Sequence, residues 1–158
     1  MVIGTGSPDR CLTDRETYDL VKEALSTLEL NGKRVLFLIP DGTRSMPMPQ
    51  LAAIFDDLLA SQVRSLDYLV ALGTHQPMSD AQLTKLLGKP VQDGQMGNSR
   101  VFNHLWSEPS TFFQSGTISG ERIYELTGGM MSEEVPVRLN RLVQAYDQII
   151  ICGPVFPH

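Results

Sequence analysis

The amino-acid sequence predicts an α/β domain built on a mostly parallel sheet with helices on both faces, of the Rossmann-like kind. Two observations predict this fold. Short apolar segments of strand length occur along the 158-residue chain, and they alternate with longer segments whose apolar residues recur at helical spacing. Strands buried on both faces have nearly continuous apolar sequences, and parallel neighbours need crossover connections, which are usually helical. The alternation therefore favours a parallel sheet covered by helices.

The first half of the chain begins with a polar lead-in and a predicted helix. Thr13 stands where a helix N-cap is expected, and Glu16 follows at the capping-box spacing. Apolar residues then recur at helical spacing up to Leu28. Further on, Ser79 is a second candidate N-cap, and Gly88 is suited to ending that helix. The other expected elements are a strand within residues 31–40, a helix over 48–63, a strand within 66–75 and a helix over 78–88.

The second half departs from this alternation in its middle. Residues 99–106 ("SRVFNHLW") are expected to form a third strand, and residues 148–155 ("QIIICGPV") a last buried strand. Between them, residues 116–129 ("GTISGERIYELTGG") have a polar-apolar pattern that predicts two short strands. Residues 132–147 ("SEEVPVRLNRLVQAYD") predict a strand or turn that leads into a helix. The hairpin-like segment is therefore an excursion from the parallel pattern.

The composition limits the classes of function. With 42% hydrophobic and 20% charged residues the chain is typical of a globular protein, and its net charge of −5 gives no attraction for nucleic acid or an anionic membrane. The first residues lack the pattern of a secretory signal, and no apolar run is long enough to span a bilayer. Cys11 and Cys152 are too far apart in sequence for a metal knuckle or a redox pair. We therefore expect a cytoplasmic protein.

Three polar clusters lie at predicted strand ends, where parallel α/β sheets bind their ligands. In the first, "PDGTR", a loop from strand to helix exposes backbone N–H groups that can hold an anion. Thr43 adds a donor, and Arg44 offers two parallel donors for a carboxylate or phosphate. Asp41 can orient Arg44 or accept from a ligand hydroxyl. The same spacing fits an ordinary loop in which Asp41 caps the next helix and pairs with Arg44, so both interpretations stay open.

The other two clusters contain histidines. His75 follows the second predicted strand, and His158 follows the last strand as the final residue. Imidazole exchanges protons near neutral pH, so both are candidate acid–base groups. Taken alone, His75 also fits a half-buried histidine bonded to the backbone, and His158 the simple end of the chain. His104, beside Trp106, is expected to be a packed or surface histidine, and no two histidines have the short spacing of metal ligands.

Taken together, the three clusters resemble the nickel-pincer lactate racemases, the LarA-like family. The segment "IPDGTRSMP" resembles that family's Asp-x-Thr-Arg-Pro motif, and "GTHQPMS" resembles its Gly-(Thr/Phe)-His-Arg-Pro-x-(Ser/Thr) motif. The segment "VPVRLNRLVQAYDQIIICGPVFPH" is similar to the family's Val-x-x-Asn-(Arg/Lys) helix, the buried strand after it and the histidine that ends it. The resemblance covers residues 30–158 in the right order, and it implies the N-terminal domain of an isomerase.

The resemblance also implies roles for individual residues. His75 and His158 match the two catalytic histidines of the family, which exchange the substrate hydroxyl proton from opposite sides while a cofactor takes hydride from the α carbon. That cofactor is a nickel-pincer nucleotide, nickel(II) pyridinium-3,5-bisthiocarboxylate mononucleotide. In the family, the lysine that carries it and the histidine that ligates nickel lie beyond the match to His158, so no metal ligand is expected in this chain. The cofactor-binding loop matches Asp41, Gly42, Thr43 and Arg44.

The matched segments predict residues 1–29 as a lead-in and helix, and residues 30–158 as a racemase-like N-terminal α/β domain, truncated at its C-terminal end, in a larger two-domain protein. We therefore expect the 158-residue chain alone to have no racemase activity and to bind no stoichiometric nickel. The expected partners are a 2-hydroxy acid and a C-terminal domain of the same protein, and apolar surface left by truncation favours self-association.

Two departures from the family motifs leave the substrate open. Gln76 stands where the family commonly has Arg, and Ser45 stands where the motif has Pro. These changes leave room for a different 2-hydroxy acid, or for a different reaction on the same fold. The alternatives are a non-catalytic binding domain for an anionic metabolite or nucleotide, and a metal-dependent hydrolase that uses the histidines directly.

Overall fold

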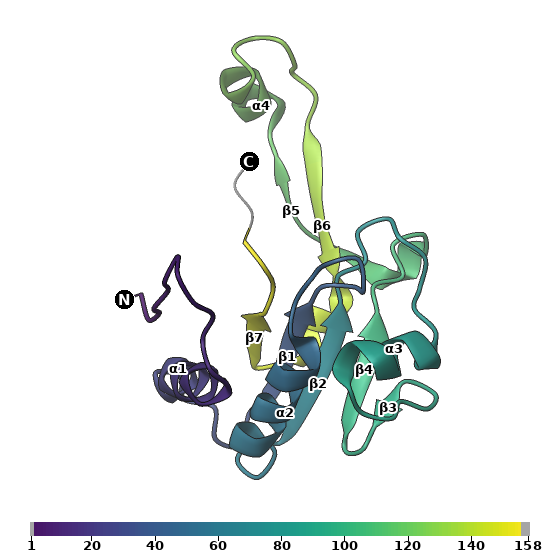
Figure 1. Cartoon of the computed structure of the whole chain (residues 1–158). Helices are drawn as coiled ribbons and strands as arrows, with labels where there is room; N and C mark the ends of the chain where they lie inside the picture. The colour runs from purple at the N-terminus through teal and green to yellow at the C-terminus, as the bar shows by residue number, and fades with distance from the viewer. Residues whose placement is uncertain (1, 156–158) are drawn as a thin grey trace.

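A five-stranded sheet forms the centre of the fold, and the computed structural model describes residues 2–155 around it (Figure 1). The strand order is β3-β4-β2-β1-β7, so the first two long strands lie in the middle and the last strand lies at an edge. The strands are β1 (Arg34–Ile39), β2 (Ser65–Val70), β3 (Gln95–Met96), β4 (Ser99–Asn103) and β7 (Gln148–Ile151).

The sheet is parallel except at the β3 edge. Strand β1 pairs in parallel with both β2 and β7, and β2 pairs in parallel with β4, whereas β3 and β4 form a short antiparallel pair. The start of β7 is held to β1 by Asp147, whose carboxylate accepts hydrogen bonds from the backbone N–H of Arg34 and from its guanidinium, each at 2.8 Å. The predicted α/β fold with a mostly parallel sheet is confirmed.

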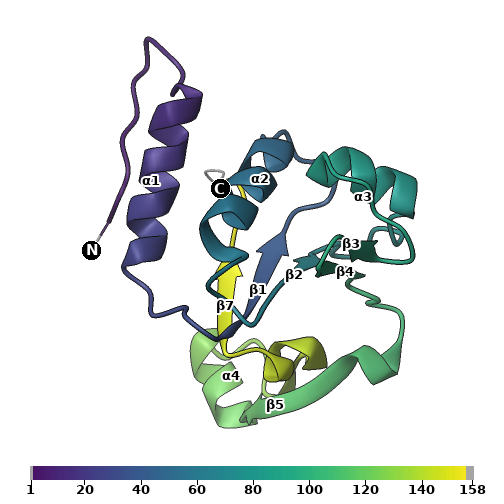
Figure 2. The same cartoon turned by 90° about the horizontal axis from the view of Figure 1, so that it is seen from below.

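Helices cover the two faces of the sheet unequally (Figure 2). One face carries α2 (Met48–Leu59) and α3 (Asp80–Leu87), with α1 (Asp14–Ser26) beside α2. The opposite face carries the short 3₁₀ helix η2 (Arg141–Ala145). Just after η2, the Tyr146 hydroxyl donates to the buried carboxylate of Asp67 in β2 at 2.8 Å. None of the helices in residues 2–155 is both long and apolar enough to cross a membrane.

The expected helix ends are present. Thr13 and Glu16 form a capping box at the start of α1, and Arg10 binds the Glu16 carboxylate, which lowers the pKa of Glu16 to about 2. Gly88 ends α3 with a positive φ of 71°. A Cβ on Gly88 would lie 2.7 Å from the Cβ of Pro49, so glycine also lets the end of α3 approach the start of α2.

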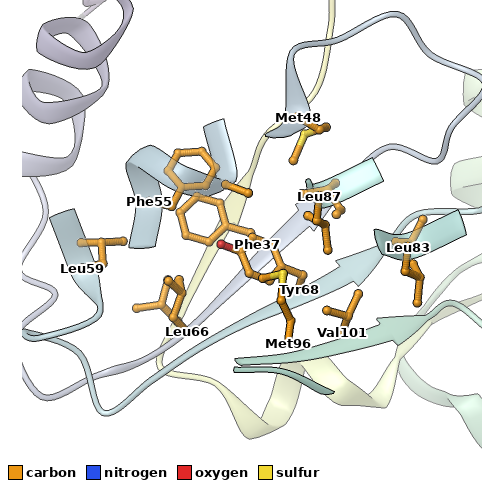
Figure 3. Close-up of a cluster of buried hydrophobic side chains, with 14 of the residues drawn as sticks. Phe37, Met48, Phe55, Leu59, Leu66, Tyr68, Leu83, Leu87, Met96 and Val101 are labelled. Carbon is orange, nitrogen blue, oxygen red and sulfur yellow. The ribbon is translucent and has the colours of Figure 1, made fainter. Parts of the chain in front are cut away.

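The core lies between the sheet and helices α2 and α3 (Figure 3). Phe37 of β1 is fully buried and stacks on Phe55 of α2 and Tyr68 of β2, with ring centroids 4.1 and 5.9 Å away. Because side chains alternate along a strand, the apolar residues of β1 that flank Phe37 at a spacing of two also face this core. The mostly apolar strands of the sequence are thus buried on the helix side.

The part of the chain that follows β4 and precedes β7 forms an antiparallel arm, which projects from the sheet (Figure 1). After the 3₁₀ helix η1 (Pro109–Thr111), strand β5 (Phe112–Ile118) pairs with β6 (Val135–Asn140), and helix α4 (Gly120–Leu126) lies between them at the tip.

The expectation of two short strands over residues 116–129 is wrong, because only the end of β5 lies there and α4 follows. The Ser119 side chain accepts a hydrogen bond from the backbone N–H of Arg122, which is an N-cap, and Arg122 pairs with Glu125 one helical turn on. These local interactions outweigh the apparent alternation.

Candidate functional site

A cavity of about 620 Å³ opens at the carboxyl ends of β1 and β2. The loop after β1 forms one wall, the loop after β2 forms another, and one side of α3 forms a third. This is the edge of a parallel sheet at which ligands are expected. The lining residues are Asp41, Gly42, Thr43, Arg44, Met46, Pro49, His75, Gln76, Met78, Gln82, Lys85 and Leu86.

Asp41 and His75 form a hydrogen-bonded pair in this cavity, although they are 34 residues apart in the chain. The Nδ1 atom of His75 lies 2.5 Å from Oδ2 of Asp41. The other carboxylate oxygen, Oδ1, accepts from the backbone N–H of Thr43 at 3.0 Å and from its hydroxyl at 2.5 Å. Asp41 is only 7% exposed, and these hydrogen bonds hold both of its oxygens in place.

The surroundings of Asp41 favour its ionised form. Burial is the largest single influence, and it raises the pKa of Asp41. The hydrogen bonds from Thr43 and His75 lower the pKa, and their combined effect is larger than that of burial. The net pKa of Asp41 therefore lies below its usual value. At neutral pH the carboxylate is ionised and can only accept hydrogen bonds.

An ionised Asp41 determines the tautomer of His75. Because the carboxylate accepts, Nδ1 of His75 must carry the proton, and the neutral ring then has its lone pair on Nε2. The His75 side chain is 57% exposed and lines the cavity, so a ligand there can reach the ring. A carboxylate that binds Nδ1 of an imidazole, with Nε2 as the remaining acceptor, is the arrangement of a general base oriented by a carboxylate.

The loop before His75 is shaped by a tight turn. Gly73 has a positive φ of 60°, a conformation that glycine adopts without steric cost. The His75 N–H donates to the carbonyl of Leu72 at 3.0 Å, and the His75 carbonyl accepts from the indole N–H of Trp106 at 3.0 Å. The backbone of His75 is therefore held on both sides.

Two cations line the cavity. Arg44 comes from the loop after β1, as the sequence analysis expected, and Lys85 comes from α3. Lys85 was not among the residues expected from the sequence, because no motif or predicted strand end lies beside it in the chain. A signal was present in the spacing of Gln82, Lys85 and Leu86, which places all three on one side of a helix. With Asp41 as the only carboxylate among the lining residues, this part of the cavity favours an anion.

The structure brings five of the six expected site residues into one cavity, and their roles remain predictions. His158 lies outside the described residues. Helix α2 starts at Met48 with Pro47 at its N-cap, so Asp41 does not cap that helix, in contrast to the ordinary-loop interpretation. The five residues are Asp41, Gly42, Thr43, Arg44 and His75.

His104 lies away from the cavity, packed as expected. Its Nδ1 is 3.0 Å from the Asn140 amide nitrogen, and its ring meets the edge of Phe112 with centroids 5.4 Å apart. Within residues 2–155, no group of three or more His, Cys, Asp or Glu side chains is arranged to hold a metal ion.

Replacing Asp41 by asparagine is expected to change how stability depends on pH. Because the folded-state pKa of Asp41 is lowered, its ionised form stabilises the protein above the unfolded pKa of about 3.9, and this contribution is lost as the pH falls through the folded pKa. We expect Asp41→Asn to cost about 1–2 kcal/mol near neutral pH. The difference from the wild type should shrink below about pH 4, as measured by urea unfolding followed by circular dichroism.

The control for removal of a carboxylate is Asp9→Asn, which lies in the exposed N-terminal segment. A difference between Asp41→Asn and the wild type that stays constant from neutral to acidic pH would contradict the expected ionisation of Asp41.

Comparison with known proteins gives a family and a fold. The sequence model of a family described as the lactate racemase N-terminal domain matches residues 19–158. The chain is similar to the crystal structure of a protein from Thermotoga maritima, with a TM-score of 0.75 and 25% identity over 89% of this chain and 33% of that one. It is also similar in fold to the lactate racemase apoprotein from Thermoanaerobacterium thermosaccharolyticum, with a TM-score of 0.56 and 18% identity over 85% of this chain and 31% of that one.

The chain thus spans about a third of the length of each of these two solved structures. Comparison with curated proteins gives no match.

Proposed function

Because the chain belongs to the lactate racemase N-terminal domain family, we propose that it is the N-terminal catalytic domain of a racemase that interconverts the enantiomers of a 2-hydroxy acid. The observation that carries this proposal is the Asp41–His75 pair inside a cavity at the strand ends. The pair supplies an oriented base where a small anionic substrate can reach it.

His75 has the role of proton acceptor for the substrate hydroxyl. Inverting the α carbon of a 2-hydroxy acid through a keto acid requires loss of the hydroxyl proton as hydride leaves the carbon. Nε2 of His75 accepts that proton, and the adjacent Asp41 carboxylate stabilises the imidazolium that forms. The reaction in the other direction needs a second acid–base group on the opposite side of the substrate, and His158 is the candidate from sequence.

The cavity residues fit a phosphate-bearing pyridinium nucleotide, the nickel-pincer nucleotide implied by the resemblance. Arg44 and Lys85 offer positive charge to a phosphate from two different walls, while the Thr43 hydroxyl is engaged with Asp41 and shapes the loop beside them. Asp41 and Gly42 complete the loop that would contact it. When bound, this cofactor supplies a hydride acceptor for the α carbon of the substrate.

We further propose that the rest of the protein closes this cavity. The chain spans about a third of the structures that it matches, and a C-terminal domain of the same protein is the partner that fits the remaining length. Apolar side chains that remain exposed at the end of β7 are candidates for this contact, since Ile151 is 80% and Val155 is 95% exposed.

The proposal is tested with the full-length protein, loaded with the nickel-pincer nucleotide and given single enantiomers of 2-hydroxy acids, L-lactate first, in deuterium oxide. Chiral chromatography should detect the opposite enantiomer, and mass spectrometry should find that the α hydrogen is retained, because hydride returned from a cofactor does not exchange with solvent. Deuterium at the α carbon would indicate proton abstraction instead, and the absence of turnover on every acid would reject the racemase.

A second candidate is a non-catalytic domain that binds an anionic metabolite or nucleotide. The presence of two cations in the cavity favours it, because an anion site needs no acid–base chemistry. It predicts that the 158-residue chain binds the same probe anions as the racemase, while the full-length protein has no turnover.

Replacing Lys85 by alanine is expected to weaken anion binding by about 5- to 10-fold, the loss of one charge-assisted contact made by an exposed side chain. Isothermal titration calorimetry with nicotinic acid mononucleotide as the probe measures the dissociation constant at low and high salt, where screening should reduce the difference. The matched control is Lys22→Ala on α1, which removes a lysine outside the cavity. Equal affinity of the two variants would rule out Lys85 as an anion-binding residue.

A further inference from the structure

The loop that carries His75 is exposed to solvent over residues 73–77, yet it is tied to the neighbouring strand β4. The backbone N–H of Met78 donates to Oδ1 of Asn103 at 3.0 Å, and the Asn103 amide nitrogen donates to the carbonyl of Met78 at 2.9 Å. A single asparagine side chain thus satisfies both backbone groups of one loop residue.

The position of Asn103 in β4 explains how it reaches the loop. Val101 faces the core under the helices, Phe102 faces the opposite side, and Asn103 faces the helix side again at the end of the strand. Asn103 also pairs in register with Val70, the last residue of β2. The chain leaving β2 must cross this point to start α3, so Met78 passes directly over the Asn103 amide.

Met78 connects this contact to the other wall of the cavity. Its side chain packs against the core, and its Cε would lie 3.7 Å from a Cβ placed on Gly42, next to Asp41. Holding the backbone of Met78 therefore restricts movement of the loop that carries His75, and the Met78 side chain lines the same cavity as the loop of Asp41. Trp106, three residues after Asn103, adds a third hydrogen bond through its indole N–H to the His75 carbonyl at 3.0 Å.

We propose that Asn103 is a positioning residue for His75. It does not line the cavity, and it acts by fixing the backbone of the loop at Met78 so that Nδ1 of His75 meets the Asp41 carboxylate. The assignment of a catalytic consequence rests on the proposed function, whereas the effect on the geometry of His75 does not. A displacement of about 1 Å at a reacting group can reduce turnover about 100-fold, so a contact that only fixes the position of a loop can change the rate of the reaction.

The test is Asn103→Leu, which keeps a side chain of similar size and removes both hydrogen-bonding groups. In the 158-residue chain, long-range ¹H–¹⁵N correlation of the His75 ring should give a single Nδ1-protonated tautomer for the wild type. It should give averaged ring nitrogen shifts, from a mixture of tautomers, for Asn103→Leu. The control is Asn98→Leu in the β3–β4 turn, which is exposed and should give the wild-type spectrum.

In the loaded full-length protein, Asn103→Leu should lower kcat about 10- to 100-fold with a much smaller change in KM, because Asn103 does not line the cavity and its loss disturbs proton transfer by His75 more than substrate binding. If Asn103→Leu does not fold, Asn103→Asp keeps an acceptor for the Met78 N–H but replaces the donor by a charged oxygen that the Met78 carbonyl repels, and it should shift the tautomer ratio in the same direction. A His75 spectrum in either folded variant identical to that of Asn98→Leu would overturn the positioning role. If the tautomers of His75 mix in the Asn103 variants but the loaded wild-type protein has no racemase turnover, the proposed function is rejected and the positioning role is kept.

Discussion

Replacing His75 by alanine is expected to reduce racemisation by the full-length protein about 100- to 10,000-fold, the usual contribution of a positioned acid–base group. The reason is the hydrogen bond between Nδ1 and Asp41, which leaves Nε2 as the proton acceptor in the cavity. Without the imidazole, the substrate hydroxyl must lose its proton to water. The measurement is the rate of formation of the opposite enantiomer by chiral chromatography.

The nickel content of the same preparations separates catalysis from cofactor loading. His75→Ala should load nearly as much nickel as the wild type, because the phosphate contacts are assigned to other residues. Arg44→Ala should lose loading, because it removes a cation that lines the cavity. Equal loss of nickel in both variants, measured by elemental mass spectrometry, would contradict the separate roles assigned to them.

Replacing Phe37 by alanine is expected to lower the free energy of unfolding by about 3–5 kcal/mol, a large part of the 5–15 kcal/mol typical of a domain. Phe37 is 0% exposed and stacks on Phe55 at 4.1 Å, so its removal leaves a cavity between β1 and α2 that rigid neighbours cannot fill. Urea unfolding of the 158-residue chain, followed by circular dichroism, measures the change.

The matched aromatic control is Tyr124→Ala on α4, where the side chain is 56% exposed. Its effect should stay within about 0.5 kcal/mol, as is usual for surface positions. A loss below about 1 kcal/mol for Phe37→Ala would mean that the core repacks around the missing ring.

Most elements of the fold could be predicted because their causes lie within a few neighbouring residues. The apolar run of β1, the capping box of Thr13 and Glu16, and the glycine that ends α3 each depend on local spacing or backbone conformation. The prediction failed at α4 because seven helical residues are too few to establish a period against an alternating background. There the Ser119 cap was the better signal.

The candidate site could be predicted only in part for a related reason. Strand ends were recognisable in the sequence, so residues 41–44 and His75 were identified as candidates. Asn103 has no distinguishing feature in the sequence, and Lys85 has only the helical spacing that it shares with Gln82 and Leu86. The importance of both comes from what lies across a cavity or on a neighbouring strand. Identifying them requires knowledge of strand order and register.

The sequence alone determined the class of fold, the strand ends at which polar side chains gather, and the family resemblance, because periodicity, caps and turns act over short distances along the chain. Only the tertiary structure decided that Asp41 and His75 share a hydrogen bond, and that Asn103 is bonded to the loop that carries His75. Partners that are 34 and 25 residues apart meet only when parallel strands take their order and register, and the buried sheet then determines which loops are neighbours.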